Sequence, residues 1–199
     1  MSFIKTVSDD TATGLAAELL ERDRAALGYV PNYAKLFTLR PEVYEAWANL
    51  NGALKRSMDL RRYELATLAA ASALRSSYCS LAHGRILAER FLPAEQVMDI
   101  VGGPEAASLD TADRAVVDFA RKVALNADQV TAADIDRLRS VGLTDEEVFE
   151  VVLAAAVRCF FSKTLDATGT APDGAYRALD ADLRESLTVG RPIEESGGR

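Results

Sequence analysis

The sequence predicts an all-α protein. Three observations favour this fold class: apolar residues recur every three or four positions, alanine is abundant, and no run of β-branched residues alternates with polar ones. Hydrophobic residues make up 49% of the 199 residues, enough to bury a substantial core without disulfides. We expect a single domain over residues 1–199, with an N-terminal half of residues 1–101, a C-terminal half of residues 109–185 and a tail of residues 186–199.

The first part of the chain is predicted to form three helices. A capping start at Asp9 or Asp10 leads into a helix that Gly28 ends, and a shorter helix then reaches Leu39. Pro41 opens a third helix, whose apolar residues fall on one stripe, and such a stripe predicts packing against the core. The residues of this stripe are Val43, Trp47, Leu50 and Leu54.

The helix that begins at Leu60 is expected to lie at the centre of the fold. Its many alanines allow neighbouring helices to approach closely. A further helix is expected to end at the turn containing Pro93, and the loop VGGPEAASLD, residues 101–110, is the clearest break between the two halves.

The C-terminal half is predicted to contain three helices that each open with a threonine cap, at Thr111, Thr131 and Thr144. The stretches LRRYELATLAAASALRSSYCS and LTDEEVFEVVLAAAVRCFFSK share an acidic start and an alanine-rich run that ends near a cysteine. Two related helical hairpins, one in each half, are therefore a further hypothesis. The tail VGRPIEESGGR is expected to lie extended on the surface or to fray.

Composition and charge argue against two classes of partner. A net charge of −7 without a basic stripe argues against nucleic acid, and no apolar run approaches the roughly 20 residues that span a bilayer. The start of the chain, MSFIKTVSDD, lacks the apolar region of a signal peptide, which favours a cytoplasmic location with reduced cysteines.

The stretch RSSYCSLAH, residues 75–83, contains the only histidine and one of the two cysteines. On a helix, Ser76, Cys79 and His83 share one face, and the thiol and the imidazole lie one turn apart. A neighbouring imidazole or a helix N-terminus stabilises a thiolate, which is the reactive form of cysteine. This stretch is therefore the candidate active site.

Glu64 can join this site only if the chain bends. On an unbroken helix it would lie more than about 20 Å from Cys79. The two serines after Arg75 can cap a new helix, which would place Cys79 in its first turn. The preceding helix would then fold back and bring Glu64 towards His83.

Structural roles are the alternative for these residues. A lone buried cysteine usually behaves as a small hydrophobe, and a lone histidine is often a hydrogen-bonded core residue. No metal is expected, because one histidine and two cysteines cannot supply the three or four ligands of a conventional zinc site unless carboxylates or several subunits contribute.

The spacing of Glu64, Ser76, Cys79 and His83 resembles the motif of the AhpD-like alkylhydroperoxidase and carboxymuconolactone decarboxylase superfamily. That motif is a glutamate, eleven residues, and then Cys-x-x-Cys-x-x-x-His; here serine replaces the first cysteine. The stretches GYVPNYAKLFTLRPEVYEAW and DFARKVALNADQVTAADIDRLRSVGLTDEEVFEVVLAAA and the final VGRPI resemble its peroxidase-related branch. The resemblance implies an AhpD-like helical fold, assembly as a homo-oligomer (dimer, trimer or hexamer), and reduction of hydrogen peroxide or alkyl hydroperoxides.

The resemblance also implies a role for each motif residue. Cys79 would be the peroxidatic nucleophile, His83 its base or proton shuttle, and Glu64 the group that orients the histidine. Tyr78 stands where well-studied members have a second relay histidine, and its hydroxyl can donate a hydrogen bond. Ser76 can cap a helix and hydrogen-bond the Cys79 thiolate, but it cannot form a disulfide.

These roles predict a one-cysteine cycle that uses an external thiol as reductant and no cofactor. Cys159 lies in an apolar stretch and is expected to pack in a helix rather than to resolve a sulfenic acid. Tyr33, Phe37 and Trp47 are expected in the core, although they could line a pocket for an organic hydroperoxide. Two other functions stay open: a lyase or isomerase that uses His83 for proton transfer, and a redox sensor without turnover.

Overall fold

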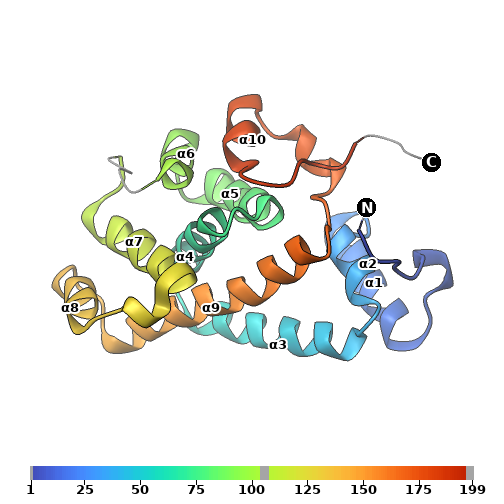
Figure 1. The fold of residues 1–199 in the computed structure, drawn as a ribbon, viewed down its shortest axis with the longest axis horizontal. Helices are drawn as coiled ribbons and strands as arrows, with labels where there is room; N and C mark the ends of the chain where they lie inside the picture. The colour runs from blue at the N-terminus through green and yellow to red at the C-terminus, as the bar shows by residue number, and fades with distance from the viewer. Residues whose placement is uncertain (1, 104–107, 196–199) are drawn as a thin grey trace.

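The computed structural model describes residues 2–103 and 108–195, and over these residues it forms ten α-helices and no β-strand, which confirms the predicted all-α fold (Figure 1). No helix of this described part is long and apolar enough to cross a membrane. The helices are α1 (Gly14–Leu27), α2 (Asn32–Phe37), α3 (Pro41–Ser57), α4 (Leu60–Ala73), α5 (Ser77–Arg90), α6 (Ala94–Gly102), α7 (Thr111–Asn126), α8 (Ala132–Ser140), α9 (Asp145–Ala167) and α10 (Ala181–Leu187).

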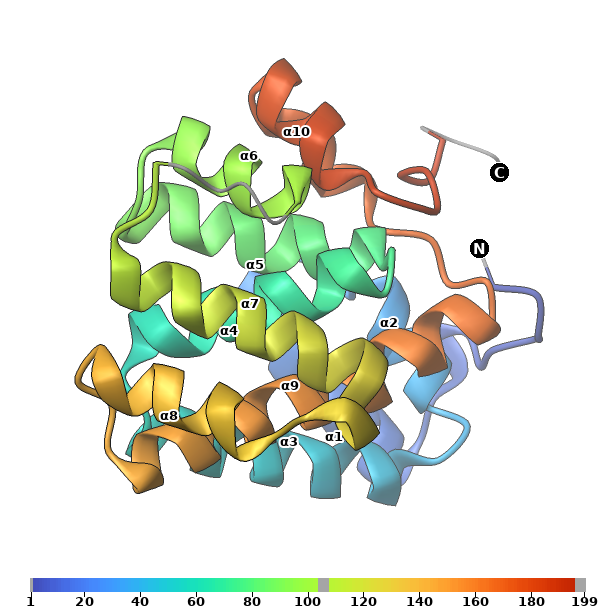
Figure 2. The same ribbon diagram turned by 60° about the vertical axis from the view of Figure 1, so that its left-hand side comes forward.

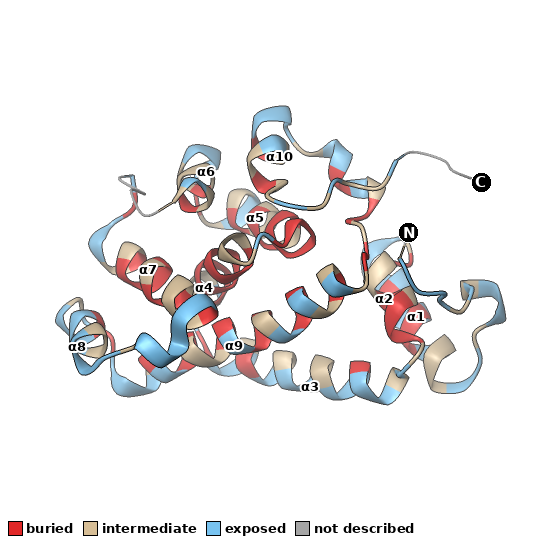
Figure 3. Ribbon diagram, viewed as in Figure 1, coloured by how far each residue is buried: buried red, intermediate tan, exposed pale blue. Residues whose placement is uncertain are grey.

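Helix α4 forms the centre of the fold, as its alanine content predicts. Every residue from 63 to 71 is buried, and the helix packs against α5, α7 and α9. Figures 1 and 2 show α5 and α6 on one side of α4 and α9 and α3 on the other, and Figure 3 shows α4 buried along most of its length. Because α7 and α9 come from the predicted C-terminal half, the two halves share one core.

The chain breaks sharply between α4 and α5, as the serines predict. Arg75 has a left-handed backbone with φ of 58°, and the Ser76 N–H donates to the Ala71 carbonyl at 2.9 Å. Helix α5 begins at Ser77 and packs along α4. The break therefore places Cys79 in the first turn of α5.

Helix α3 buries a different stripe from the predicted one. Leu54 is buried, but Val43 and Leu50 are 44% and 52% exposed, and Tyr44 is buried in their place. The Tyr44 hydroxyl donates to Asp23 Oδ2 at 2.5 Å, so this side chain buries its ring and satisfies its polar end. Helix α3 lies at the outside of the fold, so only part of its apolar stripe reaches the core (Figure 3).

Several helix boundaries also differ from the predicted ones. Residues Asp9–Thr11 form a short 3-10 turn before α1, and α2 ends at Phe37. The predicted threonine caps occur at Thr131 and Thr144, each within a capping box. Helix α7 is instead capped by Asp110, whose carboxylate accepts from the Asp113 N–H at 2.8 Å.

The hypothesis of two related helical hairpins is wrong. LRRYELATLAAASALRSSYCS is split between α4 and α5, whereas LTDEEVFEVVLAAAVRCFFSK runs into one unbroken helix of 23 residues, α9. The physical reason is local: two serines follow the first alanine run and end the helix, but Phe160 and Phe161 follow Cys159 and continue it.

The described part of the tail is extended, as expected, but it is held against the fold. The Gly190 N–H donates to Ser77 Oγ at 2.8 Å, at the start of α5. The Glu194 carboxylate accepts from Asn32 Nδ2 at 2.8 Å and from the Gly174 N–H at 2.9 Å. A Cβ atom at position 190 would collide with the Arg75 carbonyl, so this crossing requires glycine.

Candidate active site

Cys79 lies in the wall of a cavity of about 300 Å³ that also contains His83. Cys79 belongs to the first turn of α5, where the backbone N–H groups are not used within the helix and the helix end is positive. The thiol itself is buried. The other residues that line the cavity are Leu27, Tyr29, Tyr33, Trp47, Asn51, Lys55, Tyr78, Ala82, Arg85, Ile86, Arg158, Phe161 and Tyr176.

Glu64 and His83 meet, as expected if the chain bends between their helices. Glu64 Oε2 lies 2.5 Å from His83 Nδ1, and both side chains are buried. Burial alone raises the pKa of Glu64, but its pair with His83 and the charges of Lys55 and Arg158 lower it below its ordinary value. The ionised carboxylate therefore accepts from the Nδ1–H and leaves Nε2 of the imidazole as an acceptor.

His83 is neutral at pH 7. Burial and the neighbouring Arg158 charge lower its pKa to about 4, although Glu64 acts in the opposite direction. A neutral imidazole with an unprotonated Nε2 is the form that can accept a proton.

Arg158 of α9 is a part of this site that the sequence reasoning missed. It is only 3% exposed, and its Nη1 donates to Cys79 Sγ at 3.5 Å while Nη2 donates to the Tyr63 hydroxyl at 3.3 Å. Burial disfavours its charge, but Cys79 and Tyr63 raise the pKa of Arg158 above its ordinary value. The sequence feature that could have identified Arg158 is an arginine inside the apolar run AAAVRCFF. Arginine is almost never buried unless another group pairs with its charge.

The Tyr78 hydroxyl bonds to Asp173 rather than to the Cys79 thiol. It donates a short hydrogen bond to Asp173 Oδ2, and the same carboxylate accepts from the Asn32 N–H at 2.8 Å. Burial and the Asp173 charge raise the pKa of Tyr78 well above its ordinary value, so the hydroxyl stays protonated. Asp173 was also missed, because the stretch TAPDGAY indicates only a turn.

Ser76 occupies the N-cap position of α5, but its hydroxyl does not cap the helix. Its backbone carbonyl accepts from the Ser80 N–H at 2.9 Å, which starts the helix. The expected hydrogen bond from the hydroxyl to Cys79 is not formed, and Ser76 does not line the cavity.

Residues 41–122 match the model of the carboxymuconolactone decarboxylase family. This matched segment runs from α3 to α7 and contains Glu64, Cys79 and His83. The chain is therefore similar to this family over the part that carries the predicted motif. This match agrees with the superfamily expected from the motif spacing, and no curated protein matches the chain.

Solved structures share the fold over nearly the whole chain. An uncharacterized peroxidase-related protein from Ralstonia eutropha JMP134, with an alkylhydroperoxidase AhpD core, is 23% identical with a TM-score of 0.75, covering 96% of this chain and 98% of that one. A peroxidase-related protein from Silicibacter sp. TM1040 is 22% identical with a TM-score of 0.74, covering 88% and 91%. The debrominase Bmp8 is 16% identical with a TM-score of 0.73, covering 92% and 96%; a cysteine-to-alanine variant of it forms a complex with 2,3,4-tribromopyrrole. These likenesses confirm the AhpD-like fold.

The second cysteine of the chain lies outside the cavity. Cys159 Sγ lies 3.9 Å from the Ala124 carbonyl of α7, and neither cysteine is in a disulfide. Burial raises the pKa of the Cys159 thiol above its ordinary value. Its surroundings fit the packing role expected from the sequence.

Two of the three aromatic residues that could either pack in the core or line a pocket, Tyr33 and Trp47, do line the cavity. Trp47 stacks on Phe161 with ring centroids 4.1 Å apart, and Tyr33 lies edge-on to the same phenylalanine at 5.5 Å. Phe37 is buried behind them and does not line the cavity. Residues spaced for core packing can therefore also form the wall of a site.

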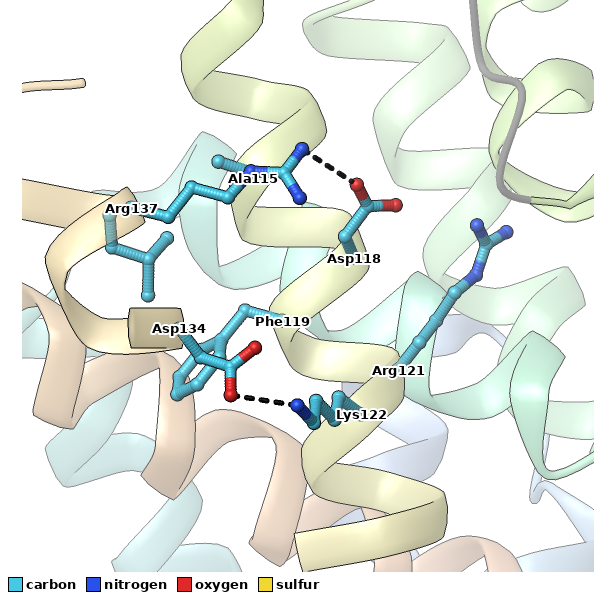
Figure 4. A pocket seen from close by; sticks show the side chains of 8 residues that line it. Ala115, Asp118, Phe119, Arg121, Lys122, Asp134 and Arg137 are labelled. Carbon is cyan, nitrogen blue, oxygen red and sulfur yellow. Dashed lines mark hydrogen bonds and ion pairs between the residues drawn. The ribbon is translucent and has the colours of Figure 1, made fainter. Parts of the chain in front are cut away.

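A second hollow, of about 410 Å³ between α7 and α8, differs in its chemistry (Figure 4). Lys122 Nζ lies 2.7 Å from Asp134 Oδ2, and Arg137 Nη2 lies 3.3 Å from Asp118 Oδ2. Each of these cations is paired with an acid, and the hollow contains no cysteine or histidine. In the described residues, no group of three or more His, Cys, Asp or Glu side chains is placed to hold a metal ion.

Proposed function

We propose that this protein is a thiol-dependent peroxidase that reduces hydrogen peroxide or organic hydroperoxides at Cys79. The observation that carries the proposal is the position of a buried guanidinium at hydrogen-bond distance from this thiol. Arg158 Nη1 lies 3.5 Å from Cys79 Sγ, and Arg158 forms no ion pair with a carboxylate of the described chain. A buried cation without a carboxylate partner is satisfied best by an anion. The Cys79 thiol and the Tyr63 hydroxyl both lie within hydrogen-bond distance of Arg158, and thiols in general ionise at lower pH than phenols.

In the first step, the Cys79 thiolate attacks the terminal oxygen of the hydroperoxide. An S–O bond forms, the O–O bond breaks, and the leaving alkoxide takes a proton to become an alcohol. Hydrogen peroxide gives water in the same way. The sulfur is oxidised to a sulfenic acid while the hydroperoxide gains two electrons.

His83 moves the proton in this step, one helical turn from Cys79 on α5. Its neutral Nε2 accepts the thiol proton and returns it to the alkoxide. Because burial and Arg158 disfavour the imidazolium, the proton is not retained on the ring. Glu64 orients the ring through Nδ1, Ser76 starts the helix that presents the thiol, and Tyr78 closes the cavity wall through its bond to Asp173.

A small external thiol completes the cycle. It attacks the sulfenic sulfur, water leaves, and a mixed disulfide forms; a second thiol then attacks this disulfide and releases reduced Cys79 with an oxidised thiol dimer. Ser76 has no sulfur, and Cys159 does not line the cavity, which supports a reductant from outside the chain.

The test is the intact mass of the reduced protein after about one equivalent of an organic hydroperoxide, with a sulfenic-acid trap present. We expect one adduct on Cys79 in the wild type and in Cys159→Ser, no adduct in Cys79→Ser, and recovery of the thiol when a small thiol replaces the trap. An unmodified Cys79 would overturn the proposal. Oxidation of Cys79 that no added thiol reverses would indicate a redox sensor instead of a peroxidase.

A second candidate is a lyase or isomerase, favoured by the neutral His83 held by Glu64. That pair alone suffices for proton transfer and would not need the thiol. Cys79→Ser separates the two functions, because a lyase would keep its activity in this variant.

We also propose assembly as a homo-oligomer. Large apolar side chains are exposed on two helices that pack side by side, Leu50 on α3 and Phe149 and Phe160 on α9. Light scattering behind a sizing column tests this, and a monomeric mass over the whole concentration range would exclude it.

A further inference from the structure

The wall of the Cys79 cavity differs from the rest of the chain in composition. Of the fifteen residues that line it, six are aromatic and three are cationic, and none is Asp or Glu. In the whole chain only 7% of residues are aromatic, and acids outnumber Lys and Arg by 30 to 23. An acidic protein therefore presents a cationic, aromatic surface beside its candidate nucleophile.

We propose that this cavity binds a planar organic anion, with its ring against the aromatic wall and its negative group at Arg85. This names the substrate class of the same site and rests on the proposed function: the hydroperoxide would be carried by an aromatic or conjugated acid.

Two of the three cations in the wall already have partners. Lys55 Nζ lies 3.6 Å from Glu64 Oε1 and 4.9 Å from the centre of the Tyr63 ring. Arg158 is held by Cys79 and Tyr63. Turning either side chain towards a ligand would take a hydrogen-bond or ion-pair partner away from a buried group.

Arg85 is the cation in the wall whose bonding is least satisfied. It lies on α5 two residues after His83, its side chain is 41% exposed, and its nearest carboxylate, that of Glu89, is 4.0 Å away and itself exposed. Its Nε is buried and has no hydrogen-bond partner in the described residues. The guanidinium lies over the Tyr176 ring at 5.9 Å, so it is held at the cavity with donors available for a carboxylate.

The aromatic wall is rigid and flat enough to hold a ring. Trp47 and Phe161 stack with an angle of 22° between their planes, and Tyr33 lies edge-on to both Phe161 and Tyr78. Rings fixed by one another offer a ligand stacking contacts at a small entropic cost. A volume of about 300 Å³ is at the small end for ligand sites, which fits a molecule with a single ring.

The experiment uses the only tryptophan of the chain as a reporter, because Trp47 lines the cavity. Tryptophan fluorescence of the Cys79→Ser protein is followed during titration with benzoate, benzamide and benzylamine, which carry the same ring with negative, zero and positive charge. We expect benzoate to bind about tenfold more tightly than benzamide, and benzylamine to bind most weakly.

Arg85→Gln is expected to remove the preference for benzoate and to leave benzamide binding unchanged. Arg90→Gln is the matched control, since this exposed arginine of the same helix does not line the cavity. Equal affinities for benzoate and benzamide in the parent protein, or a preference that survives Arg85→Gln, would overturn the inference.

This binding experiment is independent of the chemistry at sulfur. If benzoate binds as expected but the wild type does not consume hydroperoxide, only the proposed peroxidase function fails. If hydroperoxide is consumed but benzoate has no preference over benzamide, only the assignment of the substrate class fails.

Discussion

The two cysteines of this chain lie in opposite surroundings. Cys79 is in the first turn of α5, in a cavity wall, with a guanidinium 3.5 Å from its sulfur. Cys159 lies within α9, packed against the Ala124 carbonyl, and burial raises the pKa of its thiol. Cys79 is the more deeply buried of the two, so exposure to water is not what distinguishes the candidate nucleophile.

One residue of α9 separates the two environments. Arg158 faces the cavity and Cys79, while its neighbour Cys159 faces α7, because consecutive helical residues point about 100° apart. The backbone N–H groups around Cys159 are used within the helix, whereas those of the first turn of α5 are not. The contrast shows that a charge and a helix terminus, rather than the cysteine itself, create the candidate nucleophile.

The largest expected effect is on peroxidase activity, when each of the two cysteines is replaced by serine separately. Cys79→Ser removes the nucleophile and should lower the rate of hydroperoxide consumption by at least about a thousandfold. Cys159→Ser should leave the rate near that of the wild type. Peroxide consumption in the presence of a small thiol measures both rates. An equal loss of activity in the two variants would show that Cys79 is not the sole nucleophile.

The second largest expected effect is a decrease in the free energy of unfolding at low pH, caused by protonation of His83. The pKa of His83 is lowered from 6.5 to about 4, so the unfolded chain binds a proton at higher pH than the folded one. The stability from neutral His83 is therefore complete above about pH 6.5 and is lost as the pH falls towards 4. The expected loss is on the order of 3 kcal/mol, about a hundredfold in the unfolding constant.

His83→Asn tests this assignment, because asparagine can still donate to Glu64 but does not titrate. Urea unfolding at several pH values should give a flatter dependence for the variant than for the wild type. Burial raises the pKa values of Asp166 and Asp173, which act in the opposite direction in both proteins and cancel from the difference between them. The difference therefore reports on the His83–Glu64 pair, because His83 also lowers the pKa of Glu64. Identical slopes would show that His83 is not held neutral.

Arg158→Met is expected to slow the reaction of Cys79 with hydroperoxide by about tenfold, since a charge-assisted hydrogen bond is worth roughly 1.5 kcal/mol or more. Methionine fills similar space without leaving a buried charge. Arg158→Lys should lose less, because it keeps the cation. Single-turnover oxidation of the reduced protein measures the rate. An unchanged rate in Arg158→Met would show that the guanidinium does not activate Cys79.

Much of the site could be predicted because its geometry is local. The serines after Arg75 end one helix and begin the next, and this break places Cys79 in a first turn and brings Glu64 to His83. Helix caps and short spacings along one chain segment are readable from residue types alone.

The rest could not be predicted because it depends on distant parts of the chain. Arg158 and Asp173 reach Cys79 and Tyr78 across 79 and 95 residues, and no local pattern reports such contacts. Trp47 has the spacing of a core residue, yet it lines the cavity as well as stacking on Phe161. A periodic pattern identifies the buried side of a helix but does not tell a filled core from the wall of a cavity.

The smallest effect concerns the role of Cys159 itself. Cys159→Ala should lower the free energy of unfolding by about 1 kcal/mol, because it removes one half-buried sulfur from the contact with α7, and should leave peroxidase activity unchanged. Urea unfolding at neutral pH and the peroxide assay check the two parts separately. A normal stability with a loss of thiol-dependent turnover would contradict the packing role and make Cys159 the resolving thiol, which requires α9 to move its sulfur away from α7 during the cycle.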